Sequence, residues 1–408
     1  MEESAGSEPD EPRPELRDRR DREEVRLRAL IVDEGRTWST LGAVRSLAHA
    51  GWSVAIGCPG ARGLSASSRY VSSRHDVPSL ARGLDGFSDA VREAVEDSGA
   101  DVVFGGGDAE VYALCIEREK IPAIVPYPPE SVVLRAFDKL ELCTSAVRHG
   151  LAAPTTEIAT DDMDVDGTMW VKSRWHWDPR SGNRPTRLEA SLETGRAAIN
   201  ARVRELRRHG AEPVLQEPVY GEQLSLIALR ANDGRTLGTV FQQVDRCWPV
   251  PTGWTVRAHT IPVDPELERG VGELLDDLGW TGLVELEFIR PDDGIPRLID
   301  FNGRFYGSMA LAIGAGVDFP ALWAADVTGQ PVKPSPPARV PVRFQRLGGD
   351  LRRAVNDRRG GLWRDVANTL SYAPGAVHSI LRANDLRPAY VYLRTFANDG
   401  RAARRADS

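Results

Sequence analysis

The chain has 408 residues, of which 41% are hydrophobic and 27% are charged, and its formal net charge is −7. These values are typical of a folded globular protein with two or three domains. Basic residues are not in excess and no basic block stands alone, so the composition argues against a nucleic-acid-binding surface. The sequence has no uncharged apolar run long enough for a membrane span and no signal-peptide core, and we therefore expect a cytoplasmic protein.

The four cysteines are scattered along the sequence, at Cys58, Cys115, Cys143 and Cys247. None has the Cys-x-x-Cys spacing that is typical of zinc sites, and the set does not resemble a disulfide framework. We expect reduced thiols, most of them buried.

Residues 1–26 differ in composition from the rest of the chain. They include ten acidic and six basic side chains and almost no large apolar ones. Such a segment buries too little apolar surface to order itself, so it is predicted to be a disordered tail.

From residue 27 to residue 108, apolar strand patterns alternate with helix patterns. This alternation predicts a parallel sheet with covering helices, as in α/β proteins. The strands are LRALIVD, WSVAIGCP and DVVFGGGD, and the helices are TLGAVRSLAHAG, which ends at a glycine, and DAVREAVEDSGA.

A glycine-rich segment, GGGDAE, occupies residues 105–110, between a predicted strand and a predicted helix. Exposed backbone amides at such a position can hold an anion. The segment lacks the spacing of a dinucleotide-binding fingerprint, and a tight turn alone would also explain its glycines.

The segment 283–304, LVELEFIRPDDGIPRLIDFNGR, has the pattern of a β-hairpin. Its Asp293-Gly294 pair predicts a two-residue type I′ turn, with apolar alternation on both sides. In that register Glu287 lies directly opposite Asp300. Like charges opposite one another destabilise a sheet, so the pattern indicates that a counter-ion balances them.

The period of two places further polar groups on the same face of this hairpin: Glu285 opposite Asn302, and Arg304 beyond it. Oxygen ligands of this kind suit Mg²⁺, which commonly takes one or two carboxylates together with substrate phosphates. The hairpin is thus a candidate metal-nucleotide site. The alternative is a solvated outer face on an ordinary hairpin.

The hairpin resembles the metal-binding strands of the ATP-grasp superfamily, and the segment GSMALAIGAGVDFP that follows is similar to carboxylate-amine ligases and carbamoyl-phosphate-synthase-like members. The resemblance implies that Glu287, Asp300 and Asn302 hold Mg²⁺ or Mn²⁺. It also implies that Arg304 steadies an acyl phosphate or a tetrahedral oxyanion. The departures are Asp300, where Glu is commoner, and Gly303 before the arginine. Glu285 is left open as a binder of the incoming ammonium, a ligand to a second metal or a bystander.

Two lysines match the phosphate-binding lysines of the same superfamily. Lys139 follows Asp138 at the start of a helix that is predicted to end at Gly150, with Pro154 beyond it. Lys172 lies in the apolar strand pattern MWVKSRW, where a buried ammonium is costly unless it meets a phosphate. Taken alone, Lys139 would be read as a solvent-exposed residue.

The segment after the second lysine, SRWHWDPRSGNRPTR at residues 173–187, corresponds in the resemblance to a mobile glycine-rich loop that covers the triphosphate. It has few glycines. Its tryptophans Trp175 and Trp177 and its arginines fit equally a cation-π cluster or a contact with an aromatic substrate.

The segment EPVLQEPVYGEQLSLIAL reads as strand, turn and strand, and it resembles the adenine-binding hinge of the superfamily. In that resemblance Gln216 and the backbone of Glu217 face the exocyclic amine. The N–H of Val219 meets a ring nitrogen, and Glu222 binds the ribose hydroxyls. A plain β-turn is the alternative.

The expected fold class is α/β (α+β), with a Rossmann-like pre-ATP-grasp domain, a two-lobed ATP-grasp domain and a small helical C-terminal extension. SRYVSSRHDVPS belongs to the part that resembles the pre-ATP-grasp domain, whose Asp108 and Glu110 are weaker candidates to face the substrate. The predicted segments are a tail at 1–26, the pre-ATP-grasp domain at 27–130, the ATP-grasp domain at 131–330 with lobes 131–215 and 216–330, a proline-rich linker at 331–342 and the extension at 343–408.

The resemblance implies an ATP- and Mg²⁺-dependent ligase that joins a carboxylate to an amine through an acyl phosphate and releases ADP and phosphate. Its expected partners are ATP, a small-molecule or peptide carboxylate and an amine acceptor, without nucleic acid or membrane, and it is a possible homodimer. Two alternatives stay open. One is a carbamoyl-phosphate-synthase-like or peptide-crosslinking enzyme, and the other is a non-catalytic nucleotide-binding regulatory module.

Overall fold

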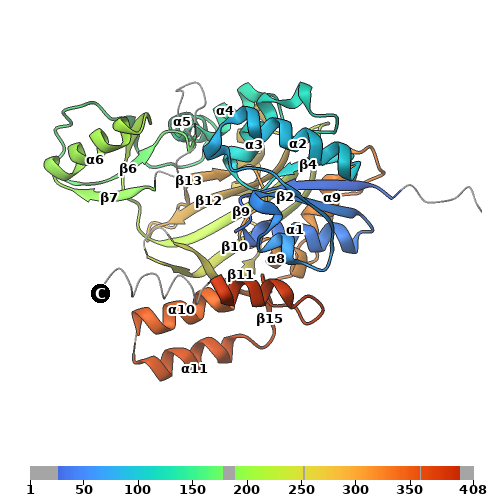
Figure 1. Ribbon diagram of the computed structural model, residues 1–408. Helices are drawn as coiled ribbons and strands as arrows, with labels where there is room; N and C mark the ends of the chain where they lie inside the picture. Colours follow the sequence, from blue (N-terminus) through green and yellow to red (C-terminus); the bar gives the residue numbers. More distant parts are fainter. Residues whose placement is uncertain (1–25, 178–188, 251–252, 359, 396–408) are drawn as a thin grey trace, which may run out of the picture.

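We describe a computed structural model of the chain over residues 26–177, 189–250, 253–358 and 360–395 (Figure 1). The predicted disordered tail therefore lies almost entirely outside the described residues. The described part contains three sheets, two of four strands and one of seven.

The first sheet is parallel, with the strand order β3-β2-β1-β4, as the alternating pattern predicts. Its strands β1 and β4 are almost wholly buried, which is the environment that suits their unbroken runs of valine, isoleucine and leucine. The helices α1 and α2 both pack on β1 and β2. The elements are β1 Arg28–Val32, α1 Trp38–His49, β2 Ser53–Cys58, β3 Val71–Asp76, α2 Leu84–Ser98, β4 Val102–Gly105, α3 Asp108–Ile116 and α4 Glu130–Phe137, with 3₁₀ turns at Pro59–Ala61, Ser65–Ser67, Leu80–Arg82 and Arg118–Lys120.

The second sheet, with the order β5-β8-β6-β7, is antiparallel and carries one covering helix, α6. It has a small hydrophobic core of its own, built from residues of β6, β8 and α6. Figure 1 shows this unit standing out to one side of the molecule. The elements are α5 Lys139–Arg148, β5 Thr156–Ile158, β6 Thr168–Ser173, β7 Ser191–Thr194, α6 Arg196–Arg208 and β8 Pro213–Gln216.

The third sheet has the order β13-β12-β9-β10-β11-β14-β15. The pairs from β13 to β14 are antiparallel, and β14 pairs with β15 in parallel. The helices α8 and α9 pack against α1, so they join this sheet to the first one. The elements are β9 Glu222–Arg230, β10 Thr236–Trp248, β11 Trp254–Ile261, α7 Pro265–Leu278, β12 Gly282–Arg290, β13 Arg297–Asn302, α8 Met309–Ala315 and α9 Phe319–Val327.

The sequence predicted a helical C-terminal extension, but the extension contains strands as well as helices. It contains the helices α10, Leu347–Asp357, and α11, Leu362–Tyr372, which form a hairpin beside the large sheet (Figure 1). It also supplies two strands to that sheet, β14, Arg343–Gln345, and β15, Ala376–His378. Each strand has only three residues, which is too short for a visible period of two.

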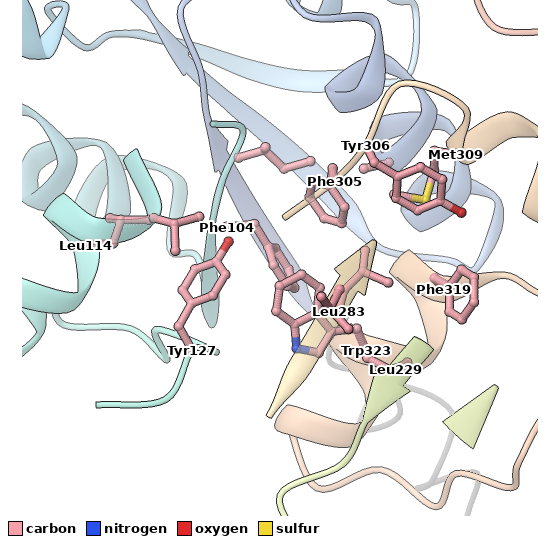
Figure 2. Packing of buried hydrophobic residues seen from close by; sticks show 14 of the residues in the cluster. Phe104, Leu114, Tyr127, Leu229, Leu283, Phe305, Tyr306, Met309, Phe319 and Trp323 are labelled. Carbon is pink, nitrogen blue, oxygen red and sulfur yellow. The ribbon is translucent and has the colours of Figure 1, made fainter. Parts of the chain in front are cut away.

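An aromatic cluster fastens the first sheet to the large one (Figure 2). The ring of Trp323 on α9 packs edge-on against Phe104 of β4 at 4.8 Å, Tyr127 at 5.3 Å and Phe305 at 5.7 Å between centroids. Edge-to-face contacts of this kind add to the stability that burial alone provides. Because Phe305 follows Arg304, the cluster fixes the position of a predicted site residue relative to β4.

Among the described residues, no single helix has the length and apolarity needed to cross a membrane. The helices α8 and α9 meet that standard only as a pair, and they are bent by 90° at the break between them.

Candidate active site

The predicted pairing of the β12–β13 hairpin is confirmed: Glu287 lies opposite Asp300, and Glu285 lies opposite Asn302. We call these four residues the acidic face. The cross-strand neighbour of Glu287 on β9 is Ser225, so the face continues onto the next strand of the sheet.

The predicted two-residue turn is wrong. A type I′ turn needs positive φ at both central residues, but in the Asp293-Gly294 pair only the glycine has it, at 79°. The connection spans residues 291–296 and is closed by a 3.0 Å hydrogen bond from the N–H of Gly294 to the carbonyl of Pro291. Next to this loop the pairing is shifted by one residue, and a bulge at Ile299 restores the predicted register.

The carboxylates of the acidic face are buried close together. The amide nitrogen of Asn302 donates to Oε1 of Glu287 at 2.9 Å and to Oε2 of Glu285 at 3.3 Å. Burial and the neighbouring Asp300 raise the pKa of Glu287 to about 7. Burial and Glu287 likewise raise the pKa of Glu285 well above its usual range. The acidic face therefore carries more negative charge than its surroundings balance.

The small sheet contributes Lys172 on β6, which is half-buried. Its Nζ donates to Oε1 of Gln216 at 2.6 Å. Burial lowers the pKa of Lys172. The positive charge of Lys139 lowers it further, whereas the negative charges of Asp300 and Glu287 raise it. The lysine and the acidic face thus act on each other electrostatically although they belong to different sheets.

Lys139 is the first residue of α5, as predicted, and its side chain is 7% exposed rather than solvated. The helix is capped by Asp138, whose Oδ1 accepts hydrogen bonds from the N–H groups of Leu140 and Glu141. Arg174 pairs with the same carboxylate at 2.6 Å. These contacts fix the helix end that carries Lys139 close to the end of β6.

Arg304 lies between the acidic face and the first sheet. Its Nη2 donates to Oδ1 of Asn302 at 2.8 Å, and its Nε donates to Oδ1 of Asp108 at 2.8 Å. His176 approaches the same carboxylate at 3.0 Å. Burial alone would raise the pKa of Asp108, but Arg304 and His176 hold it well below its usual range. Asp108 therefore stays charged and holds the guanidinium in place.

Comparison with known proteins is informative only at the level of structure. No protein-family model matches the chain, and no curated protein matches its sequence. The structure of an L-amino acid ligase from Bacillus licheniformis matches with a TM-score of 0.57 and 14% identity, over 74% of this chain and 74% of that protein. N5-carboxyaminoimidazole synthetase from Staphylococcus aureus matches with a TM-score of 0.60 and 14% identity, over 81% and 85%. The chain has the ATP-grasp fold.

A third solved structure with this fold contains a nucleotide. It is the biotin carboxylase domain of the 2-oxoglutarate carboxylase from Hydrogenobacter thermophilus, in complex with MgADP, ADP and bicarbonate. It matches with a TM-score of 0.57 and 14% identity, over 75% of this chain and 70% of that one. At these identities the likeness is one of fold, and the ligands belong to that protein.

The residues of the acidic face fit a divalent cation of the ATP-grasp type. Over the ranges that the structure describes, no group of three or more His, Cys, Asp or Glu side chains is arranged to hold a metal by itself. Mg²⁺ does not require such a group, because one or two carboxylates suffice when phosphate oxygens complete its shell. Glu287 and Asp300 would supply the two carboxylates. The direct cross-strand pairing of Glu287 with Asp300, two like charges, is the observation that favours a cation there.

The predicted adenine segment lies between the small sheet and β9. The side chain of Gln216 is 1% exposed and is held by Lys172 and by Thr156, to which its Nε2 donates at 3.0 Å. The N–H of Glu217 donates to the carbonyl of Thr155 at 2.9 Å, so in this arrangement only its carbonyl is left to accept from adenine.

The ribose end of this segment is more open. Val219 is half-buried, whereas Glu222 is exposed and pairs with Arg290, whose Nε donates at 3.1 Å. Gln243 donates to the other oxygen of Glu222 at 3.2 Å. The nucleotide contacts of this segment stay predictions.

Sequence reasoning did not single out Gln242 and Ser308, which lie behind the acidic face. Gln242 is 1% exposed, and its Nε2 donates to Oγ of Ser308 at 2.8 Å and lies 3.5 Å from Oε1 of Glu285. The sequence contained a sign of Gln242, because the pair Gln242-Gln243 interrupts the apolar pattern of β10.

The predicted covering loop is described only in part, because residues 178–188 lie outside the described ranges. The described part, Ser173 to Trp177, packs against α3 and α4. A small pocket lies there, beside Asp108, and is lined by Asp108, Tyr112, Leu134, Phe137, Trp175, His176 and Trp177.

Proposed function

We propose that this protein is an ATP-dependent ligase that joins a carboxylate to an amine through an acyl phosphate. The observation that carries the proposal is the convergence, within an ATP-grasp fold, of the acidic face with Lys172 and Arg304. Two carboxylates, a half-buried ammonium and a half-buried guanidinium are the kinds of group that stabilise in-line phosphoryl transfer from ATP. Glu287 and Asp300 would hold Mg²⁺, which would supply positive charge to the phosphate groups of ATP.

Each cation of the site has a part in this reaction. Lys139 and Lys172 bind phosphate oxygens, and the low dielectric around Lys172 strengthens that attraction. The substrate carboxylate attacks the γ-phosphoryl group, so that the bond from phosphorus to the bridging oxygen breaks and ADP leaves. Arg304 lies where it can stabilise the charge that develops on the acyl phosphate and on the tetrahedral intermediate.

Positioning matters as much as charge in this site. Arg304 makes hydrogen bonds to Asn302 at the end of β13 and to Asp108 at the start of α3, so its guanidinium is held by two separate elements. A preorganised guanidinium needs no reorganisation when charge develops. The segment from Ser173 to Trp177 packs beside Asp108, and this position favours a role in excluding water from the acyl phosphate.

The amine then attacks the carbonyl carbon of the acyl phosphate. A carbon–nitrogen bond forms, phosphate leaves with the electron pair of the carbon–oxygen bond, and the amine loses a proton. The product is an amide or peptide bond.

The test is release of ADP and phosphate by the purified protein with ATP and Mg²⁺. The carboxylate is varied over pooled amino acids, dipeptides and, in a separate arm, bicarbonate, and each pool is assayed with and without an added amine. We expect release that requires a carboxylate and an amine together. Release with bicarbonate alone would point instead to carbamoyl-phosphate-like chemistry. Nucleotide binding without turnover in any pool would favour a regulatory module, and failure to bind ATP would refute the proposal.

A further inference from the structure

The proposed reaction needs a group that takes a proton from the amine, and the residues assigned so far do not supply one. An amine with a pKa of about 10, like that of a lysine side chain, is mostly protonated at neutral pH and cannot attack a carbonyl carbon. Lys139, Lys172 and Arg304 act as cations in the proposed reaction. Glu287 and Asp300 are proposed to hold the metal. The proton acceptor therefore has to be another residue near Arg304.

A histidine and a carboxylate meet beside Arg304. Nδ1 of His176, in the segment after β6, lies 3.0 Å from Oδ2 of Asp108 at the start of α3. Burial opposes the ionisation of Asp108, but Arg304 and His176 hold its pKa well below its usual range. A charged carboxylate at this distance favours the imidazole tautomer with its proton on Nδ1, which leaves the lone pair on Nε2. It also stabilises the imidazolium that forms when Nε2 takes a proton.

The same carboxylate connects the histidine to the guanidinium of Arg304. Oδ1 of Asp108 accepts a hydrogen bond from Nε of Arg304 at 2.8 Å, and Nη2 of Arg304 donates to Asn302 at 2.8 Å. One carboxylate thus sets the positions of a candidate base and of the group proposed to stabilise the oxyanion. A base and an oxyanion-stabilising group in fixed relative positions are the arrangement that acyl transfer requires.

Other charged groups in this neighbourhood have partners of their own. Arg174, two residues before His176, pairs with Asp138 at 2.6 Å. Glu130, at the start of α4, accepts a hydrogen bond from the hydroxyl of Tyr112 on α3 at 2.9 Å. The charged group in direct contact with the imidazole is therefore the carboxylate of α3.

Glu110 is another acidic residue of the first turn of α3, but it is not accessible to an amine. Its side chain is 5% exposed and packs against Gly107. The side chain of His176, by contrast, is 50% exposed, and its ring lines the small pocket beside Asp108. The imidazole thus borders open space from which an amine can reach it.

We propose that His176 is the catalytic base of the amine step and that Asp108 is its positioning residue. This inference rests on the proposed ligase function. Nε2 of His176 takes one proton from the ammonium group of the co-substrate, and the neutral amine attacks the carbonyl carbon of the acyl phosphate. The carbon–nitrogen bond forms and the carbon–oxygen bond breaks. Phosphate leaves with the electron pair of that bond and takes up the second proton of the amine, and the imidazolium then returns its proton to water.

The test compares two nucleophiles that differ in their need for a base. The full-length protein is given ATP, Mg²⁺ and the pooled amino acids, which carry both a carboxylate and an amine, and amide formation is followed by mass spectrometry. In a parallel arm hydroxylamine is added, which is largely unprotonated at neutral pH, and the hydroxamate is measured by its iron(III) complex.

The main variant is His176→Asn, whose amide group can still donate to Asp108 but which lacks Nε2. The matched control is His209→Asn, at an exposed position at the end of α6. We expect His176→Asn to lower the rate of amide formation about 10²–10⁴-fold, the range for loss of a general base. Hydroxamate formation should fall less than about tenfold, because hydroxylamine arrives without the proton that His176 removes. The control should keep both rates.

Two results would overturn the inference. One is amide formation by His176→Asn within about tenfold of the wild-type rate. The other is an equal fall in amide and hydroxamate formation, which is the result of a purely structural role. Thermal unfolding shows whether the variant is folded. If His176→Asn does not fold, the same two rates are measured for His176→Gln and for His176→Ala with added imidazole, which should restore amide formation selectively.

The two proposals fail separately. A wild type that forms hydroxamate and amide at rates that do not depend on His176 keeps the ligase function and loses the base. A wild type that releases no ADP and forms no hydroxamate with any pool loses the ligase function, and the assignment of His176 falls with it.

Discussion

The acidic face and the first turn of α3 are two groups of carboxylates with different surroundings. On the acidic face, Lys172 and Arg304 come from other parts of the fold and partly balance the charge. At the first turn of α3, Asp108 is paired with Arg304, whereas burial and the acidic neighbours Glu34, Asp33 and Asp108 raise the pKa of Glu110 to about 8. The comparison teaches that basic groups from distant segments, and not burial alone, decide whether a carboxylate stays charged.

The largest effect is expected from removing the two carboxylates of the acidic face that are proposed to hold the metal. We expect the double variant Glu287→Gln, Asp300→Asn to lose at least about 10³-fold in the rate of ADP release, because both carboxylates proposed to hold the metal are removed. A coupled assay of ADP with ATP and Mg²⁺ measures the rate. The variant Glu119→Gln is the matched control and should keep the wild-type rate. Activity within tenfold of the wild type would show that the metal binds elsewhere.

The group that connects the two regions is Arg304. Arg304→Lys keeps the charge but cannot bond to Asn302 and Asp108 in the same fixed geometry. We expect kcat to fall about 10²–10³-fold, with a smaller change in the KM for ATP. Arg297→Lys, at the start of β13 and paired with the loop residue Asp293, serves as the control. An unchanged kcat would mean that the guanidinium only fastens the two sheets together.

The cation that the small sheet contributes is expected to affect nucleotide binding more than chemistry. Lys172→Met removes the ammonium near Asp300 while nearly conserving the volume of the side chain. We expect the KM for ATP to rise about tenfold to a hundredfold, as for loss of a charge-assisted hydrogen bond. Steady-state kinetics over a range of ATP concentrations gives this value, and the exposed Lys333→Met is the control. A normal KM with a lowered kcat would mean that Lys172 stabilises the transition state without contributing to the binding of ATP.

The smallest expected effect concerns the pH dependence of stability that Glu110 causes. Burial raises the pKa of Glu110 from 4.5 to about 8, so between these values the folded protein binds more protons than the unfolded chain. The stabilising contribution of the protonated form is therefore complete below about pH 4.5 and is lost as the pH rises toward 8. The variant Glu110→Gln has no ionisable carboxyl group at this position, so it does not lose this stability as the pH rises. Urea unfolding without ligand should show that the variant gains stability over the wild type by on the order of 1–2 kcal/mol between pH 5 and pH 8.

The same experiment contains its own control for the acidic face. Glu287 titrates in an overlapping range, but it does so in both proteins, so the difference between them isolates Glu110. An equal pH dependence of wild type and variant would show that Glu110 is charged and balanced in the folded protein.

Much of the acidic face followed from local pattern, although the turn beside it did not. The period of two put Glu287 opposite Asp300, and the structure confirms it. The pairing near the loop was wrong by one residue, because a bulge at Ile299 cannot be read from alternation alone. The strands β14 and β15 were missed for a related reason, since three residues carry too little pattern.

Other features depend on residues far apart in the chain. The sequence offered Asp108 only as a weak candidate that might face the substrate, and its bond to Arg304 joins α3 to a segment 196 positions away. The burial of Glu110 could not be predicted from the sequence either, because an Asp-x-Glu at a helix start is usually a solvated first turn.

By itself, the sequence determined the parallel first sheet, the capped helix that begins at Lys139 and the cross-strand pairs of the acidic face. Each of these follows from hydrophobic periodicity and capping chemistry, which act over a few neighbouring positions. Only the tertiary structure decided which charges meet: Lys172 with the acidic face, Arg304 with Asp108, and Glu110 with the acidic residues Asp33 and Glu34. Burial and charge pairing are properties of three-dimensional surroundings, and those surroundings come from segments that local pattern does not connect.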